Sequence, residues 1–244
     1  MWKFPGGRLR WGLLPVAAPL VLTVGIAPAH GAATHPAEAH RSSSVVDPHE
    51  KCVLSNGPYQ REVERLLGLT VDGEQSADDC QAIQRYQEGQ VIVPANGSAG
   101  PITYAALYLD WALNHTGELH GCPTRQGRVA CVDLDHQIMW VATAGKVTFA
   151  PVGVRSGQTE TPTRTGWFTV YWRNRDHVST LYDSPMPFSQ FFSGGQAIHG
   201  VYGNIYEGAG SHGCVNLRYD DARRLWTTLH EGDAVYVWGH KPGT

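Results

Sequence analysis

The sequence predicts a mainly β domain with one helix, preceded by a small three-helix domain. Short apolar stretches bounded by glycine, proline and polar residues fill 128–240, whereas 52–115 carries apolar residues at helical spacing. The chain also contains 28 glycines, 8 tryptophans and 10 tyrosines, a balance that favours strands over a helical bundle. We therefore expect a β-sandwich or a barrel-like domain after the helical unit.

Residues 1–29 have the order of an export signal: a basic start, an apolar stretch over 11–27, and small residues after it. An uncleaved membrane anchor is the alternative, but the prolines and the small-residue exit favour cleavage. Residues 30–51 are rich in Ala, His, Ser and Pro and are expected to form a flexible linker. These features predict a secreted, extracytoplasmic protein without a membrane span after cleavage.

Three helices are expected in the unit that follows, at 61–69, 78–86 and 103–113. Residues 116–127 are then expected to link this unit to the β domain at 128–240. The formal net charge is −3 and no Lys/Arg cluster is present, so nucleic acid and anionic membranes are not expected as partners.

Five cysteines leave one unpaired if the protein is secreted. We expect Cys52 to pair with Cys80, across the first helix, and Cys122 with Cys131, across the segment that enters the β domain. The sequence alone leaves other connectivities open. The expected pairing leaves Cys214 as the free thiol.

In the β half, apolar stretches predict a hairpin over 128–142 and further strands at 146–154, 166–172 and 234–238. A single helix is expected from Asp220 or Asp221 to Leu229, because its apolar residues share one face and Gly232 follows it.

The segment Ser211-His212-Gly213-Cys214-Val215-Asn216 has the composition of a nucleophile loop, and Ile198-His199-Gly200 precedes it. A thiol is reactive as the thiolate, and an imidazole can remove its proton. We therefore predict Cys214 as nucleophile and His199 as base. A zinc site made of His199, His212 and Cys214 is the alternative, but no further thiol or carboxylate has suitable spacing. No metal and no cofactor are expected.

Residues 128–239 resemble the L,D-transpeptidase catalytic domain of the YkuD-like family. The resemblance rests on Thr161-Pro162-Thr163, Gly166–Val170, Met186-Pro187-Phe188, Gly194–Gly200 and Ser211–Leu217. It implies that the Gly200 carbonyl orients His199 and that the N–H groups of Gly213 and Cys214 stabilise an oxyanion. Asn216 stands where many members carry arginine.

Further residues are expected to shape the loop or contact substrate: Ser211, His212, Asn216, Tyr182, Met186 and Tyr202. A structural role is the alternative for His212, and a place in the core is the alternative for the aromatic residues.

Residues 52–115 resemble the peptidoglycan-binding type 1 module. The matching motifs are Val71-Asp72-Gly73, Ala82–Gln87 and Gly100–Tyr104. The segment 91–96 departs from the usual pattern, so a purely structural three-helix spacer remains the alternative.

Together the resemblances imply an exported enzyme of the cell wall. Its Cys214 would be acylated by a peptidoglycan tetrapeptide stem, releasing D-alanine, and an amine acceptor would take the acyl group. Carbapenem-type β-lactams are expected inhibitors. An L,D-carboxypeptidase using water, or a noncatalytic peptidoglycan-binding protein, are the alternatives.

Overall fold

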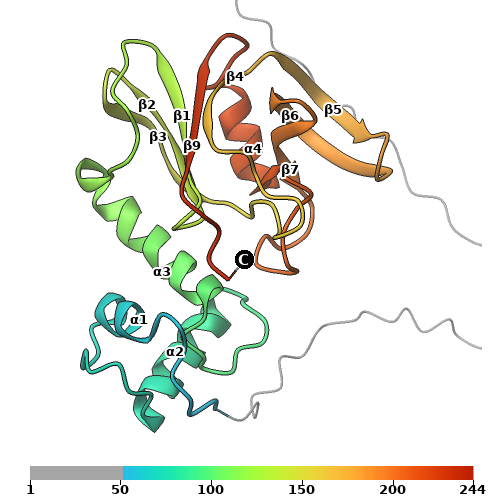
Figure 1. Cartoon of the computed structure of the whole chain (residues 1–244). Helices are drawn as coiled ribbons and strands as arrows, with labels where there is room; N and C mark the ends of the chain where they lie inside the picture. The colour runs from blue at the N-terminus through green and yellow to red at the C-terminus, as the bar shows by residue number, and fades with distance from the viewer. Residues whose placement is uncertain (1–51, 244) are drawn as a thin grey trace, which may run out of the picture. The chain divides into compact units, whose positions relative to one another are not determined.

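The structure, a computed structural model, describes residues 52–243 (Figure 1). The expected export signal and linker lie outside the described residues. Residues 52–243 belong to one compact unit. Within 52–243, no helix is both long enough and apolar enough to cross a bilayer.

Three helices precede the strands, as predicted: α1 (Gln60–Leu67), α2 (Ala77–Gly89) and α3 (Pro101–Asn114). Helix α1 ends at Gly68, which adopts a left-handed conformation with φ 69°. Ser76 caps α2 through a capping box with Asp79. Proline opens α3, where its missing N–H costs nothing. A short 3-10 turn, η1 (Thr116–Glu118), follows.

The helices pack together and also against the β region. Val63, Ile83 and Leu107 bring the three helices into one cluster, and a disulfide joins Cys52 to Cys80. Leu109 and Ala112 of α3 belong to a second cluster with residues of the β strands. A separate three-helix domain is therefore not supported, because the helices share a compact unit and a core with the sheets.

The first sheet has the strand order β3-β2-β1-β9-β4. Its strands are β1 (Arg128–Asp133), β2 (Ile138–Thr143), β3 (Lys146–Gly153), β4 (Gly166–Thr169) and β9 (Ala234–Trp238). Strands β1 and β2 form the predicted antiparallel hairpin, and β9 lies parallel to β1. The second predicted disulfide joins Cys122 to Cys131 of β1.

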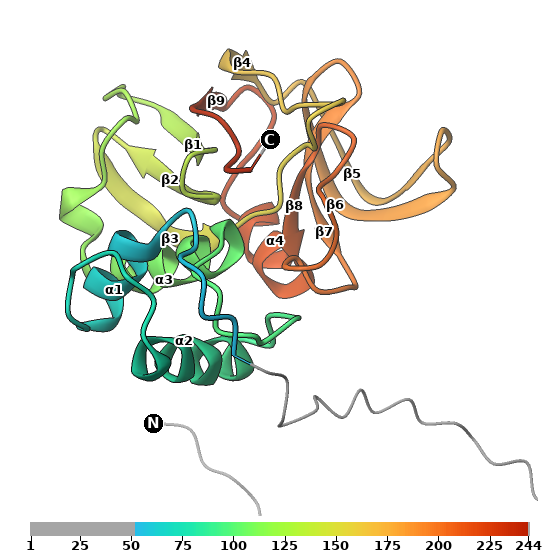
Figure 2. The same ribbon diagram turned by 60° about the horizontal axis from the view of Figure 1, so that its bottom comes forward.

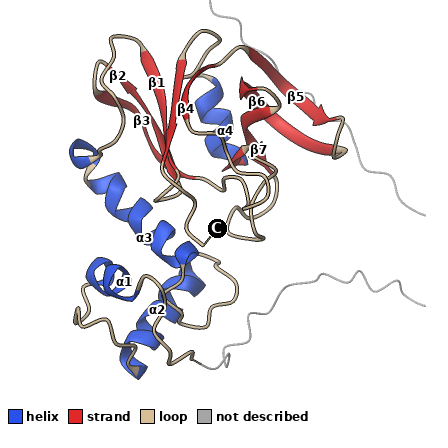
Figure 3. Ribbon diagram, viewed as in Figure 1, coloured by secondary structure: helices blue, strands red, loops and turns tan. Residues whose placement is uncertain are grey.

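The second sheet has the order β5-β6-β7-β8, and these strands lie side by side in Figure 2. They are β5 (Trp172–Ser179), β6 (Ser184–Ser193), β7 (Gln196–Val201) and β8 (Val215–Arg218). Helix α4 (Tyr219–Trp226) follows β8 directly and contacts this sheet (Figure 3). Strands β7 and β8 are parallel, which places His199 beside Asn216.

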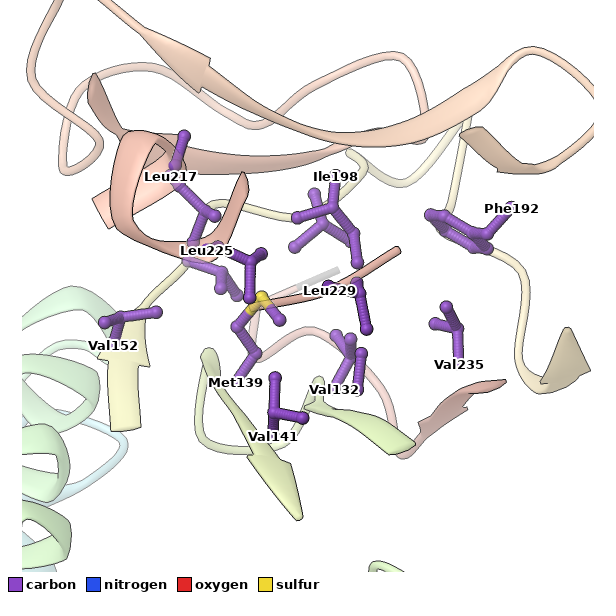
Figure 4. Packing of buried hydrophobic residues seen from close by; sticks show 14 of the residues in the cluster. Val132, Met139, Val141, Val152, Phe192, Ile198, Leu217, Leu225, Leu229 and Val235 are labelled. Atoms are coloured by element: carbon purple, nitrogen blue, oxygen red, sulfur yellow. The ribbon is translucent and has the colours of Figure 1, made fainter. Parts of the chain in front are cut away.

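The main hydrophobic core lies between the two sheets. Figure 4 shows its side chains: Val132, Met139, Val141 and Val235 come from the first sheet, and Phe192, Ile198 and Leu217 from the second. Leu225 of α4 completes the cluster and is fully buried. Burial of these apolar side chains holds the two sheets together.

The predicted strand at 166–172 is wrong in one respect. Strand β4 ends at Thr169 in the first sheet, and Trp172 begins β5 in the second. Val170 donates its N–H to Asp233 O, and Tyr171 donates to Phe191 O, so the chain changes sheets between them. The mainly β prediction itself is confirmed, as two sheets with a few helices.

Candidate active site

A cavity of about 420 Å³ opens where β7, β8 and the β5–β6 hairpin meet. It is lined by most of the residues predicted for the site: Cys214, His199, Ser211, His212, Asn216, Tyr182 and Met186. Gly200, Gly213 and Tyr202 do not line it. Tyr202 is 71% exposed and stacks on Tyr219, with ring centroids 5.1 Å apart.

Parallel pairing of β7 with β8 brings the two sequence motifs together. Ile198 lies opposite Val215, so Cys214 enters β8 at the level of Ala197. The Ala197 N–H points at Cys214 Sγ, at 3.4 Å. The two motifs are therefore neighbours in one sheet, although the intervening loop is long.

His199 is almost fully buried, with 6% of its surface exposed. Its Nδ1 lies 2.8 Å from Gly200 O, the contact that the family resemblance implies, and its Nε2 lies 2.9 Å from Asn216 Nδ2. Because an amide nitrogen donates and a carbonyl accepts, Nδ1 carries the proton and Nε2 the lone pair.

Burial lowers the pKa of His199 to about 4. The hydrogen bond to Gly200 O opposes this shift and the nearby Arg155 charge adds to it. The imidazole is therefore neutral at pH 7, the form in which Nε2 can accept a proton.

Cys214 is the free cysteine of the described chain and is partly buried. It packs beside Met186, Phe191 and Ala197. Burial raises the pKa of its thiol, and the Ala197 N–H opposes that rise. Within 52–243, Sγ has hydrogen-bond contacts with Ala197 N and Gly195 O, and none with His199. The free protein thus holds a neutral thiol and a neutral imidazole.

Ser211 and Gly213 fix the loop that carries the thiol. Ser211 Oγ donates to Cys214 O at 2.5 Å and accepts the Gly213 N–H at 3.1 Å. Thr163 Oγ1 donates to Gly213 O at 3.0 Å. The Gly213 N–H, expected to face an oxyanion, is thus bonded to Ser211 in this arrangement.

His212 stacks on Tyr182, with ring centroids 4.3 Å apart and planes 15° apart. Tyr182 lies in the turn between β5 and β6, so this contact joins the hairpin tip to the nucleophile loop. Both rings line the cavity. No cluster of His, Cys, Asp or Glu within 52–243 is arranged to hold a metal ion.

The sequence did not predict the roles of Arg155, Arg164 and Gln196, which line the cavity. Gln196 Oε1 accepts the backbone N–H of Arg164 at 3.0 Å, and Gln196 Nε2 donates to Pro162 O at 2.9 Å. Gln196 belongs to the motif Gly194–Gly200 that carries the family resemblance, and that motif was the signal for it in the sequence. Arg155 follows β3, 61 residues from its partner Asn216, and nothing local to it marks the site.

A model of the YkuD family, described as the L,D-transpeptidase catalytic domain, matches residues 127–237. Among solved structures, an L,D-transpeptidase from Stackebrandtia nassauensis is 35% identical, with a TM-score of 0.56 over 80% of this chain and 97% of that one.

Two further structures show weaker similarity. An L,D-transpeptidase from Xylanimonas cellulosilytica is 27% identical, with a TM-score of 0.46 over 78% of this chain and 98% of that one. L,D-transpeptidase 3 from Mycobacterium tuberculosis, in complex with a faropenem-derived adduct, is 18% identical, with a TM-score of 0.42 over 46% and 60%.

A search of curated proteins finds no match. The range that the family model matches nevertheless contains both motifs that meet in the cavity, and the Stackebrandtia structure shares the fold. The chain therefore belongs to the L,D-transpeptidase family of YkuD-type catalytic domains, and this family implies an acyltransferase.

Proposed function

We propose that this chain is an exported cysteine L,D-transpeptidase that cross-links the cell wall. It acylates Cys214 with a peptidoglycan tetrapeptide stem, releases D-alanine, and passes the acyl group to an amine acceptor. One observation carries the proposal: a partly buried thiol and a buried neutral imidazole line the same cavity.

The proton moves between Cys214 and His199 in both half-reactions. Sγ attacks the carbonyl carbon at the L-centre of the stem's diamino acid, and its proton passes to His199 Nε2. The tetrahedral adduct then expels the D-alanine amine, which takes that proton, and a thioester remains. The acceptor amine attacks the thioester, gives a proton to Nε2, and leaves a thiolate that recovers it.

This proton transfer requires a change at His199. In the free protein its Nε2 accepts from Asn216, so the thiol has to replace that amide as the partner of Nε2 when the stem fills the cavity. Starting from a neutral pair suits the low pKa of His199 and the raised pKa of Cys214. The reaction then forms charge only when the substrate carbonyl is in place.

The adduct's oxyanion is stabilised by the Cys214 N–H and by the Gly213 N–H. The second donor becomes available when Ser211 Oγ turns away from it, which breaks a bond of 3.1 Å. Each donor of this type contributes roughly 3 to 4 kcal/mol in enzymes where it has been removed.

Export and wall attachment complete the proposal. Two disulfides fit an extracytoplasmic compartment, and residues 1–29 supply the signal. The proposed division of the chain keeps 52–115 as a peptidoglycan-binding unit that raises the local concentration of stems near the cavity, 116–127 as linker, and 128–240 as catalytic region.

The test uses the purified chain and two reagents. After incubation with a carbapenem, intact mass should rise by one carbapenem on the wild type and remain unchanged for Cys214→Ala. With a tetrapeptide and a diamino-acid amine acceptor, the wild type should release D-alanine and form the transfer product. Release of D-alanine with the tripeptide as the other product would identify an L,D-carboxypeptidase instead. An adduct on Cys214→Ala, or no adduct on either protein, would contradict the proposal.

A further inference from the structure

Arg155 is held beside the catalytic histidine by contacts of both backbone and side chain. Its N–H donates to Asn216 O, and the Asn216 N–H donates back to Arg155 O, each at 3.0 Å. Its Nε and Nη2 donate to Asn216 Oδ1 at 3.3 and 3.1 Å, and Asn216 Nδ2 in turn donates to His199 Nε2. One amide side chain therefore joins the guanidinium to the base.

The guanidinium keeps capacity for a ligand. It has five N–H donors, and the bonds to Asn216 and a bond from Nη1 to Glu207 O at 2.5 Å use three of them. Within the described part of the chain, no carboxylate lies within salt-bridge distance of Arg155. Burial lowers the pKa of Arg155, and the charge of Glu207, which lies beyond ion-pair distance, only partly opposes that shift. An anion bound directly to the half-buried guanidinium would therefore stabilise it.

The cavity around it favours an anion. Its described lining includes the cations Arg155 and Arg164 and contains no Asp or Glu. The two cations differ in their surroundings, because Arg164 Nη1 bonds Ser193 O at 2.8 Å and lies with the β6–β7 turn. Arg155, in contrast, bonds Asn216, whose side chain also contacts His199.

The chemistry of the donor supplies such an anion. A tetrapeptide stem ends in D-alanine, whose free α-carboxylate is separated from the scissile carbonyl by only the amide nitrogen and one carbon. A stem carbonyl that reaches Cys214 therefore brings this carboxylate into the same cavity. Guanidinium and carboxylate form paired, charge-assisted hydrogen bonds.

We propose that Arg155 binds the α-carboxylate of the departing D-alanine and so selects stems that end at that residue. The inference rests on the proposed function and deepens it by assigning a specificity-determining residue. The paired backbone bonds between Arg155 and Asn216, and the pairing of Asn216 with His199 across β8 and β7, hold the guanidinium near the base.

The test compares two donors, a tetrapeptide with a free C-terminal carboxylate and the same peptide with a C-terminal carboxamide. Acylation of Cys214 is measured as kcat/KM for each donor on the purified chain. The wild type should prefer the carboxylate peptide by at least about tenfold, because the carboxamide peptide leaves the half-buried guanidinium of Arg155 without an anion. In Arg155→Gln this ratio should fall to near one.

Two further variants make the result specific. Arg164→Gln removes the other cation of the cavity and should keep the wild-type ratio. Arg155→Lys keeps the charge but loses the planar fork, so its ratio should fall at least about threefold; it also serves if Arg155→Gln fails to fold in a thermal melt.

The possible failures can be told apart. A wild type that uses both peptides equally, or Arg155 variants that keep the wild-type ratio, would overturn the inference and leave the transpeptidase assignment standing. A wild type that forms a carbapenem adduct but accepts neither peptide would overturn the tetrapeptide donor and this inference together.

Discussion

The position before Cys214 requires glycine for two physical reasons. Gly213 has φ +105°, in the region that L side chains rarely adopt. A Cβ there would also lie 2.2 Å from Gln196 Nε2. The sequence motif predicted Gly213 as an N–H donor. It did not predict the steric requirement for glycine, because that requirement comes from Gln196, which lies next to Gly213 only once β7 and β8 have paired.

The same distinction holds for the rest of the site. Cys214, His199 and the Gly200 carbonyl follow from two short motifs, because each motif is continuous in the chain. Arg155 and its bond to Asn216 join residues 61 positions apart. Such a contact depends on how β3 leaves one sheet and β8 enters the other, and no local pattern encodes it.

Burial of His199 predicts a pH-dependent stability. Its pKa falls from 6.5 to about 4 on folding, so between these values the unfolded chain binds the proton and the folded chain does not. The contribution of His199 to the free energy of unfolding is therefore constant above pH 6.5. It falls by about 3 kcal/mol as the pH drops toward 4. Urea unfolding of the wild type and His199→Gln at pH 7, 5.5 and 4 measures this difference; parallel pH curves would refute it.

At the scale of elements, the first sheet was largely predictable and the second was not. Strands β1, β2, β3 and β9 are short apolar stretches. Half of the residues of β5 are exposed and the strand carries Arg173, Arg175 and Asp176, and β6 contains Pro185 and Pro187, residues depleted in strands. Pairing along the β5–β6 hairpin offsets these weak local preferences.

The hairpin turn bears on substrate binding through Tyr182. This side chain is 54% exposed, lines the cavity and stacks on His212. We expect Tyr182→Ala to lower kcat/KM for the tetrapeptide about tenfold, mainly by raising KM, because the wall of the cavity is lost. Tyr182→Phe keeps the ring and should stay within about twofold of wild type. Steady-state kinetics with both variants decide this, and an equal loss in the two would point to the hydroxyl instead.

On the scale of the whole molecule, α3 joins the helices to the first sheet. Its Leu109 and Ala112 share a buried cluster with Val129, Ile138 and Trp140 of β1 and β2. The sequence pattern predicted the helix but assigned its apolar face to a separate domain. Periodicity shows that a face is buried and does not show what covers it.

This shared core predicts cooperative unfolding of the helices and the sheets. Leu109 is 8% exposed, so Leu109→Ala should cost about 2 to 3 kcal/mol and lower the melting temperature of the whole chain by roughly 5 to 10 °C. Leu113, on the same helix, is 46% exposed, and Leu113→Ala should leave the transition nearly unchanged. Calorimetry of the wild type and both variants should each give one transition. Two transitions, with Leu109→Ala moving only the one that belongs to the helices, would show that residues 52–115 fold independently of the sheets despite the contacts that join them.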